Sequence, residues 1–270
     1  MRRKFEEIQW VIQKNLTNQD DLKTLVRSCE EIEVDFVEVE IMPFIDQLPA
    51  INHSKHAIFY GSTTLGELVK NNEKLKAGFF FNETAFSIEN YIKKWGEHML
   101  NFGASITTVR QLVKEDYESD KFLFVRPDSD SKSFSGEVIK FSDVKDWYNK
   151  LISSDSRVLT IDTKIIVSEP YNLRYEWRLW IVNKKVITAS KYREEFRLKK
   201  EGGCPESVVK FAENRCLEYT PHDVFVMDVC QTGDEFYIVE CGCMNSAGFY
   251  ASDIRAIVKS VTEYFLKIVT

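Results

Sequence analysis

The sequence predicts a mixed α/β (α+β) fold, in which a small parallel α/β unit precedes a larger unit rich in β-hairpins. In roughly the first hundred residues, strand-like runs alternate with helical spacing, which is the rhythm of a parallel sheet. In the second half, strand-like runs are joined by short turns, as in antiparallel hairpins. A chain of 270 residues with 44% hydrophobic residues can form one large domain or two ordinary ones.

Composition and charge exclude several classes of protein. The net charge of −6 disfavours a broad nucleic-acid or anionic-membrane surface, while leaving room for a local basic groove. No run of about 18 apolar residues is present, and the N-terminal MRRKFEEIQWVIQKN lacks the long apolar segment of a secretory signal. The six cysteines form no CxxC pair, so we expect reduced thiols in a cytoplasmic protein rather than a zinc site or disulfides.

The first unit is predicted to contain four short strands with helices between them. The strands are expected at 8–13, 35–42, 56–60 and 78–81. Asn18 is a candidate N-cap for a helix over 21–32. Gly61–Thr64 lacks the lysine and the glycine spacing of a phosphate-binding loop, so it is interpreted as a strand exit and a helix N-cap.

Helical spacing continues beyond the fourth strand. Helices are expected over 86–100 and over 106–113, the second capped by Ser105 or Thr107. The expected elements that follow are strands beginning at 121 and 137, a helix at 143–152, a strand at 164–167, a hairpin of 176–181 with 186–192, and a helix at 205–219. An amphipathic helix capped by Ser252 or Asp253 closes the chain.

The stretch from Asp223 to Tyr250 carries the first chemical signal. It is interpreted as two apolar strands joined by a tight turn, with Asp228 on the first strand, Glu240 on the second and Asn245 just beyond. Carboxylate and amide oxygens are the ligands that suit a Mg²⁺ ion that also holds phosphate oxygens. These three residues are therefore candidate metal ligands.

Cationic side chains stand at the ends of other predicted strands in this half. They are Arg126, Lys132, Arg178, Lys191 and Arg193. A nucleoside triphosphate with Mg²⁺ needs this mixture, because cations bind the phosphates and carboxylates bind the metal.

The order and spacing of these pieces resemble the ATP-grasp superfamily, and within it the bacterial and phage R2K clade. The resemblance covers about Lys121 to Phe249 and is carried by FVRPDSDSKSFSG, IIVSEP, EWRLWIVNKKVITASKYR, FVMDVC and EFYIVECGCMNSAGFY. It implies a pre-ATP-grasp α/β domain at 1–104 and an ATP-grasp domain at 105–270, with a hinge near 168–171 between two subdomains.

The resemblance also implies roles for single residues. Arg126 corresponds to the basic residue that reaches the α- and β-phosphates, and Lys132 to the flexible loop that closes over them. The hinge residues Ser168, Glu169 and Tyr171 would face the adenine. The alternatives are an arginine balancing nearby acids, a solvated turn and an ordinary strand exit before a proline.

Arg178 resembles the arginine that faces the γ-phosphate or the acyl-phosphate intermediate, with Arg193 or Lys191 on the partner strand. Strand alternation would put Lys191 and Arg193 on one face and Tyr192 on the other. A structural pair of Glu176 with Arg178 is the alternative.

Asp228 and Glu240 resemble the two magnesium carboxylates. Many members of the superfamily read Glu-x-Asn, whereas here the next asparagine after Glu240 is Asn245. Either Asn245 reaches the metal from a bulged loop, as an Asn-Ser-x-Gly-Phe/Tyr motif in the R2K clade suggests, or water or phosphate supplies the third ligand.

The implied function is an ATP- and Mg²⁺-dependent ligase that joins a carboxylate to an amine through an acyl-phosphate. The partner would be a small molecule, an amino acid or a peptide, with no nucleic acid and no membrane. A kinase acting on a hydroxyl, or a nucleotide-binding module without turnover, are the alternatives. The charged segment 194–204 is expected to be a substrate lid or a solvated connection.

Overall fold

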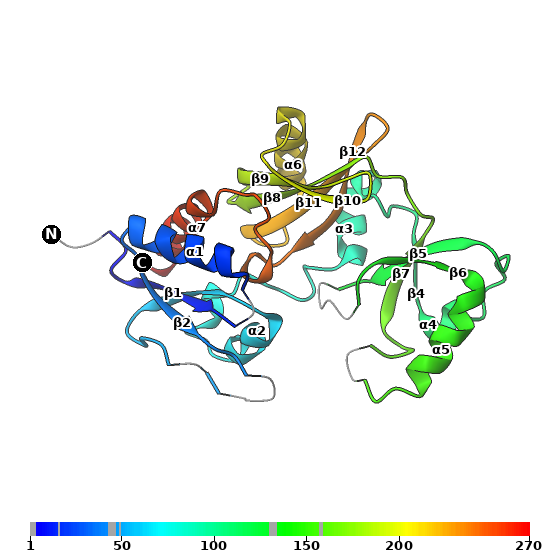
Figure 1. The fold of residues 1–270 in the computed structure, drawn as a ribbon, viewed down its shortest axis with the longest axis horizontal. Helices are drawn as coiled ribbons and strands as arrows, with labels where there is room; N and C mark the ends of the chain where they lie inside the picture. The colour runs from blue at the N-terminus through cyan, green and yellow to red at the C-terminus, as the bar shows by residue number, and fades with distance from the viewer. Residues whose placement is uncertain (1–3, 16, 43–46, 49, 130–133, 157–158) are drawn as a thin grey trace.

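The computed structural model describes residues 4–15, 17–42, 47–48, 50–129, 134–156 and 159–270. Within these residues, the strands form three sheets that follow one another along the molecule (Figure 1). A parallel sheet lies at the end that carries the N-terminus, a five-stranded sheet lies in the middle, and a four-stranded sheet lies at the opposite end.

The first sheet has the order β2-β1-β3, and both of its pairings are parallel, as the alternation of strands and helices predicted. Its strands are β1 (Ile8–Gln13), β2 (Asp35–Val39) and β3 (His56–Tyr60). Helix α1 (Gln19–Glu31) begins where the Asn18 side chain accepts from the backbone N–H groups of Asp20 and Asp21. Helix α2 (Thr63–Lys70) is capped by Ser62, which confirms the interpretation of Gly61–Thr64.

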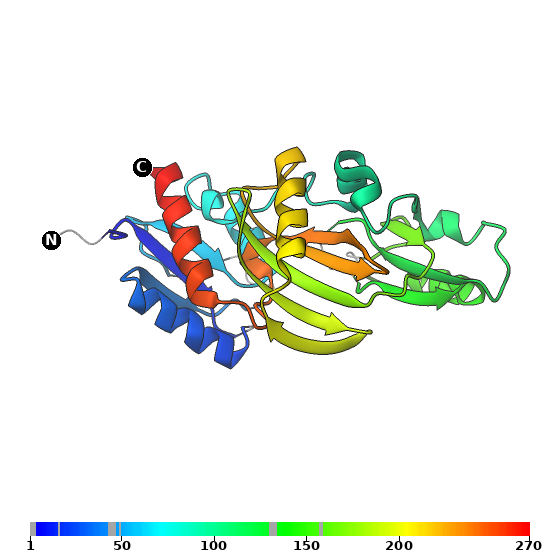
Figure 2. The same ribbon diagram turned by 90° about the horizontal axis from the view of Figure 1, so that it is seen from above.

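The last helix of the chain returns to this first unit. Helix α7 (Ile254–Val269) lies beside α1 (Figure 2), and the Trp10 indole N–H donates to the Thr262 hydroxyl at 2.9 Å. Apolar side chains of α7 share one core with those of β1 and α1. The division into 1–104 and 105–270 therefore stays a proposal, because the C-terminal helix packs on the N-terminal unit.

The middle sheet is antiparallel, with the order β10-β9-β8-β11-β12. Its strands are β8 (Tyr175–Val182), β9 (Lys185–Glu194), β10 (Arg197–Gly202), β11 (Val224–Thr232) and β12 (Glu235–Gly242). Asn183 and Lys184 join β8 to β9 with φ values of 48° and 66°, as a two-residue hairpin turn requires.

Helices α3 (Ile88–Trp95) and α6 (Glu206–Glu218) contribute to the core on one face of the middle sheet. Leu179 of β8 and Val208 of α6 are fully buried there. On the opposite face, residues of β8 and β11 either pack against the N-terminal unit or line the cleft described below.

The four-stranded sheet has the order β4-β7-β5-β6, and all of its pairings are antiparallel. Its strands are β4 (Ser105–Thr108), β5 (Phe122–Pro127), β6 (Glu137–Lys140) and β7 (Lys164–Ser168). Helices α4 (Val109–Leu112) and α5 (Val144–Ile152) pack against one face of this sheet and complete its core. In the described part of the chain, no helix is both long and apolar enough to span a bilayer.

Four expected elements differ from the structure. Residues 78–81 form no strand, because Gly78 ends a 3-10 helix, η1 (Lys76–Gly78), and lies so close to β3 that an added Cβ would sit 1.7 Å from the Ala57 carbonyl oxygen. The helix expected over 106–113 is strand β4 up to Thr108, since β4 pairs with β7. The helix expected over 86–100 spans only α3, followed by a 3-10 helix, η2 (Gly96–His98). The segment 194–204, expected as a lid or connection, contains β10, which pairs with β9.

Candidate active site

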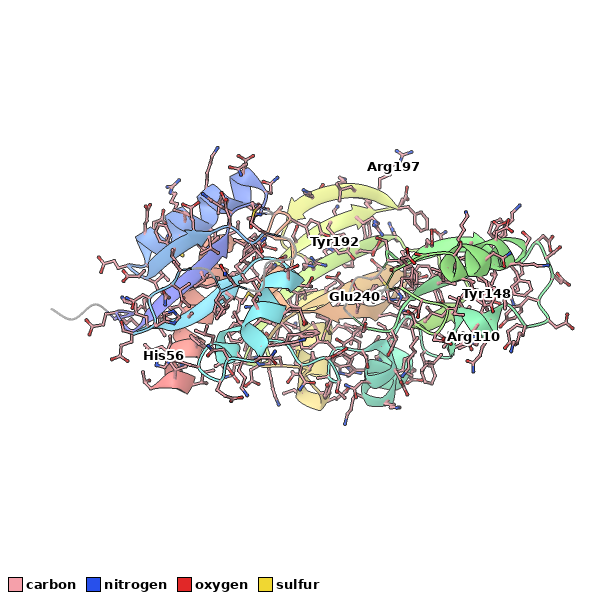
Figure 3. The ribbon with its side chains drawn as sticks, turned by 90° about the horizontal axis from the view of Figure 1, so that it is seen from below. His56, Arg110, Tyr148, Tyr192, Arg197 and Glu240 are labelled. Atoms are coloured by element: carbon pink, nitrogen blue, oxygen red, sulfur yellow. The ribbon has the colours of Figure 1, made fainter. Side chains whose placement is uncertain are left out.

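A cavity of about 580 Å³ is lined by residues of both the middle sheet and the four-stranded sheet. Its lining includes Arg126 from β5, Arg178 from β8, Asp228 from β11 and Glu240 from β12. Figure 3 places Tyr192 and Glu240 in the middle of the molecule, Arg110 and Tyr148 in the four-stranded unit and His56 in the N-terminal unit. Because its lining comes from β5, β8, β11 and β12, the cavity brings together residues from distant parts of the sequence.

The register of the middle sheet sets three charged residues side by side. Asp228 of β11 lies opposite Arg178 of β8 on one side and opposite Glu240 of β12 on the other. Side chains directly opposite each other on neighbouring strands point to the same face. The three residues thus form one row across the cleft face, and neighbouring strand residues keep the Asp228 side chain almost fully buried, at 3% exposure.

Arg178 and Asp228 form a bidentate ion pair. The Arg178 Nε donates to Asp228 Oδ1 at 2.9 Å, and Nη2 donates to Oδ2 at 2.8 Å. Burial raises the pKa of the Asp228 carboxyl, against the lowering effect of Arg178. Burial alone would lower the pKa of the Arg178 guanidinium, but the charge of Asp228 raises it overall. Arg178 therefore stays protonated.

A second pair joins the two sheets across the cleft. Arg126 of β5 donates through Nη2 to the Glu240 carboxylate and through Nη1 to the Val239 carbonyl oxygen at 3.2 Å. The Arg126 side chain is 12% exposed and that of Glu240 is 33% exposed, so the pair lies at the cavity wall rather than in bulk solvent.

A third pair lies two residues along β8 from Arg178, and the three pairs together are called the row of pairs below. Arg193 Nη1 donates to Glu176 Oε1 at 3.1 Å, and the Tyr192 hydroxyl donates to Glu176 Oε2 at 2.9 Å. The same hydroxyl lies 3.5 Å from Asp228 Oδ2 and so links the third pair to the first. Burial raises the pKa of the Glu176 carboxyl, which Arg193 and Tyr192 only partly offset.

The strand alternation expected for β9 is wrong at this point. Arg193 pairs with Glu176 and Lys191 pairs with Trp177, so Tyr192 is the extra residue of a β-bulge. The bulge lets Tyr192 and Arg193 both line the cavity, whereas Lys191 is not among the lining residues. Lys191 instead binds Glu194 at 2.8 Å and Glu201 at 2.7 Å. The structure therefore keeps Arg193 and not Lys191 beside the candidate site.

The structure does not bring Asn245 to the cavity. Asn245 is fully buried, and its Nδ2 donates to the carbonyl oxygens of Phe59 and Gly78, the latter at 2.8 Å. Its Oδ1 accepts from the Phe80 backbone N–H at 2.7 Å. The side chain thus fastens the loop after β12 to the N-terminal unit. The Asn245 side chain therefore lies away from Asp228 and Glu240, and the proposal below does not use it as a metal ligand.

The expected hinge residues have different positions. Tyr171 and the neighbouring Pro170 line the cavity, and the Ser168 hydroxyl, at the end of β7, lies 3.5 Å from Asn101 Oδ1. Glu169 is exposed, is not among the lining residues and lies 3.6 Å from Lys121. Lys132 lies outside the described residues.

The sequence did not predict most of the remaining cavity wall, and three of these residues bear on its chemistry. They are Tyr192, Tyr250 and Asn101. The rings of Tyr192 and Tyr250 stack with centroids 4.9 Å apart, and the Arg178 guanidinium lies 4.9 Å from the Tyr250 centroid. Tyr250 has a φ of 54°, which is uncommon for a bulky residue. The Gly-Phe-Tyr run at 248–250 is the one sequence signal for this stack.

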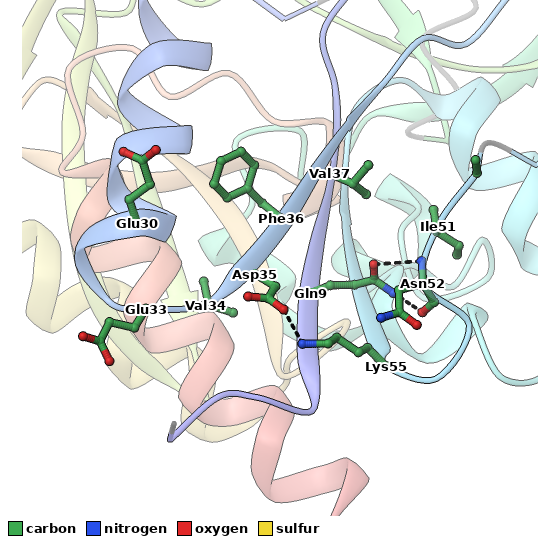
Figure 4. Close-up of a pocket in the computed structure, with 11 residues that line it drawn as sticks. Gln9, Glu30, Glu33, Val34, Asp35, Phe36, Val37, Ile51, Asn52 and Lys55 are labelled. Carbon is green, nitrogen blue, oxygen red and sulfur yellow. Dashed lines mark hydrogen bonds and ion pairs between the residues drawn. The ribbon is translucent and has the colours of Figure 1, made fainter. Parts of the chain in front are cut away.

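A larger cavity, of about 790 Å³, lies on the N-terminal unit beside β2 (Figure 4). Gln9 and Asn52 bond to each other across it, and Lys55 is paired with Asp35. Among the described residues, its lining carries three carboxylates and one cation, which is fewer cations than polyphosphate binding needs. The smaller cavity is the better candidate for a nucleotide site because its lining holds both arginines and carboxylates.

Comparisons with solved structures show which proteins share this fold. An ATP-grasp RimK domain protein from Sphaerobacter thermophilus DSM 20745 aligns with a TM-score of 0.58 at 11% identity, over 97% of this chain and 99% of that one. The D-alanine–D-alanine ligase of Bacillus anthracis, complexed with ATP, aligns with a TM-score of 0.58 at 12% identity, over 97% of each chain. The macrocyclase MdnC of Microcystis aeruginosa MRC, bound with its precursor peptide MdnA, aligns with a TM-score of 0.55 at 10% identity, over 96% of this chain and 99% of that one.

At these identities the alignments establish the fold, which is the ATP-grasp fold expected from the sequence. A comparison with curated protein sequences finds no match. A sequence model described as the ATP-grasp domain, R2K clade family 3, matches residues 62–261. Since this match spans well over half of the chain, the protein belongs to family 3 of the R2K clade of ATP-grasp domain proteins.

Proposed function

We propose that the protein is an ATP- and Mg²⁺-dependent ligase that joins a carboxylate to an amine, of an amino acid or peptide, through an acyl-phosphate. One observation carries the proposal: three arginine–carboxylate pairs stand in a row in a cleft between two sheets. They are Arg126 with Glu240, Arg178 with Asp228, and Arg193 with Glu176.

The row is suited to an exchange of partners. Three arginines and three carboxylates balance one another, so a low-dielectric cleft carries no net charge from these groups. A nucleoside triphosphate brings several negative charges and a divalent metal brings positive ones. Arginines can turn from carboxylates to phosphate oxygens while the carboxylates turn to the metal, so no buried charge is left uncompensated.

The side chains fit a magnesium ion in chemistry, though not as a preformed cage. Within the described residues, no group of three histidine, cysteine or acidic residues is placed to hold a metal by itself. Asp228 and Glu240 are register partners on adjacent strands and offer hard carboxylate oxygens. Mg²⁺ typically uses one or two protein carboxylates and takes its other ligands from water and substrate phosphates. When bound, the ion would neutralise charge on the β- and γ-phosphates.

The arginines supply the remaining electrostatics. Arg126 would bind the α- and β-phosphates. Arg178 and Arg193 would hold the transferring phosphoryl group and the acceptor carboxylate. A carboxylate oxygen attacks the γ-phosphorus and ADP leaves; the amine then attacks the acyl carbon and inorganic phosphate leaves. Fixed cations near the transferring group favour the transition state, and losing one typically costs about 10²–10³-fold in rate.

The related structures support the coarse class. One is named a ligase of two D-alanines, and another is a macrocyclase bound with a precursor peptide. Both names describe bond-forming enzymes on the same fold, which is why a ligase is proposed ahead of a kinase.

The test is an ADP-release screen with Mg²⁺-ATP against amino acids and peptides, run with hydroxylamine to trap an acyl-phosphate as a hydroxamate. We expect a substrate-dependent hydroxamate in the wild type and its loss in Arg178→Met. Lys191→Met is the matched control, because Lys191 lies on the same sheet but outside the cavity.

Each other outcome contradicts the proposal in its own way. A stable phosphorylated product without hydroxamate would identify a kinase. Tight Mg²⁺-ATP binding with no ADP release across the panel would identify a binding module. An unchanged rate in Arg178→Met would remove the row of pairs from the chemistry.

A further inference from the structure

One wall of the cleft contains a buried side-chain amide, that of Asn101, whose N–H₂ group makes no hydrogen bond to the described residues. Asn101 lies between η2 and β4 and is 1% exposed. Among the described residues, its Nδ2 has no hydrogen-bond partner. Its Oδ1 has one long contact, 3.5 Å from the Ser168 hydroxyl. A buried N–H donor without a partner is costly, so its retention calls for a reason.

The local backbone does not supply that reason. The Ala104 N–H donates to the Asn101 carbonyl oxygen at 3.0 Å and closes a turn, while the Leu100 N–H donates to the Ile238 carbonyl oxygen at 2.9 Å. An asparagine at the start of a turn commonly uses its side chain to accept from the backbone two residues on. No such bond exists here, so the turn is held by backbone groups alone.

The amide stands at the apolar part of the cavity. Strand register places Phe124 of β5 between Ser168 of β7 and Val138 of β6. Phe124, Val138, Pro170 and Leu173 line the cavity together with Asn101. The charged pairs belong to the other part of the wall, where Arg126 reaches Glu240.

If the cavity binds ATP, as the proposed function requires, its charged part and its apolar part would hold different ends of the nucleotide. Phosphates belong with the arginines, so a flat base belongs between the apolar side chains. Such a slot needs a few placed polar groups to fix the orientation of its ligand. A carboxamide N–H₂ is a donor, and an unprotonated ring nitrogen of a purine is an acceptor.

We propose that Asn101 reads the nucleobase, donating its Nδ2 hydrogen to an unprotonated ring nitrogen of adenine. The bond satisfies the buried donor only when the nucleotide is present. Binding of the correct base thus removes a cost that the ligand-free protein carries. A base that offers no acceptor at this point leaves the donor unpaired and binds more weakly.

The experiment is calorimetric titration of the full chain with Mg²⁺-ATP and with the 1-deaza, 3-deaza and 7-deaza analogues of ATP. Each analogue replaces one ring nitrogen by a C–H group. In the wild type, we expect one analogue to bind roughly 10- to 100-fold more weakly than ATP, since one buried donor is left unpaired. In Asn101→Leu, we expect ATP to weaken by a similar factor and that same analogue to lose nothing further.

The melting temperature of the ligand-free variant distinguishes a lost contact to the base from a folding defect. Asn101→Leu removes an unpaired buried donor, so the ligand-free variant should melt at the same temperature as the wild type or higher. Asn101→Asp keeps the shape, removes the N–H₂ group and should weaken ATP binding as well. Asn149→Leu, at an exposed position on α5, is the matched control and should leave the affinity unchanged.

The outcomes are distinct. Equal ATP affinity in the wild type and Asn101→Leu, or an unchanged analogue penalty in the variant, would overturn the assignment of Asn101 and leave the proposed function standing. A wild type that binds no Mg²⁺-ATP would overturn the proposed function, and this assignment with it.

Discussion

Replacement of Arg178 by methionine isolates the charge of the central pair. The methionine keeps an unbranched apolar stem, so the change removes the guanidinium rather than the packing around it. Asp228 then remains buried, at 3% side-chain exposure, without the two hydrogen bonds of 2.9 and 2.8 Å that Arg178 supplies. Breaking a buried pair in this way typically costs about 3–5 kcal/mol.

The burial of this ion pair indicates a loss of stability near the middle of that range. The Arg178 side chain is itself only 14% exposed, and the Tyr192 hydroxyl at 3.5 Å is too distant to replace the lost donors. We expect the free energy of unfolding at pH 7 to fall by about 4 kcal/mol. With a urea dependence of about 2–3 kcal/mol per molar, the unfolding midpoint should fall by roughly 1.3–2 M.

Acidity and a second substitution test the cause. Without Arg178, the folded-state pKa of Asp228 rises further above its ordinary value, so the folded protein binds a proton that the unfolded chain has lost. The destabilisation should therefore be smaller at pH 5 than at pH 8. Adding Asp228→Asn should recover most of the loss, because no buried charge remains.

Urea unfolding followed by tryptophan fluorescence measures all of these values, since Trp177 and Trp180 flank Arg178 on β8. Three results would show that the unpaired charge of Asp228 is not the cause. They are a loss under about 1 kcal/mol, a loss that grows towards low pH, and a further loss of stability when Asp228→Asn is added.

Two further predictions concern the neighbouring groups. Burial raises the pKa of Glu176 above 4.5, so its contribution to stability is present at low pH and is lost as the pH rises through the folded-state pKa. Glu176→Gln should therefore make the free energy of unfolding depend less on pH between 4 and 7. Urea unfolding that shows the same pH dependence in the variant as in the wild type would contradict this. Asn245→Asp should lower the free energy of unfolding by about 2–4 kcal/mol, because a carboxylate cannot donate to the carbonyl oxygens of Phe59 and Gly78; a stable variant whose Mg²⁺ affinity is increased would instead restore Asn245 as a metal ligand.

The sequence predicted the alternation of the first unit and the hairpins of the second because both leave periodic apolar patterns. Asp228 and Glu240 were recognisable because each interrupts a strand whose neighbours are apolar. Their placement opposite each other follows from the register of β11 and β12. The turn at 233–234 alone would set Asp228 opposite Val239. A β-bulge shifts the pairing by one residue between Val229 and Asp228, and the sequence does not indicate this bulge.

The differences arise where tertiary contacts decide. The bulge at Tyr192 exchanges the faces of Lys191 and Tyr192, and nothing in the residue types on β9 indicates an extra residue. The buried role of Asn245 depends on backbone groups of Phe59, Gly78 and Phe80, which lie more than 160 residues away in the chain. Asn101 lies in no recognisable motif, and only the structure places its unpaired Nδ2 donor on the cavity wall.

A crystal structure with Mg²⁺ and a non-hydrolysable ATP analogue would show whether the three ion pairs of the cleft open to hold the nucleotide. We expect the phosphates in the cleft beside Arg126 and Arg178, with metal–oxygen distances of about 2.0–2.1 Å to Asp228 and Glu240. The arginine–carboxylate pairs of the row should be opened by the ligand. A nucleotide bound elsewhere, or one bound in the cleft with all three pairs intact, would show that these pairs do not exchange partners to hold Mg²⁺-ATP.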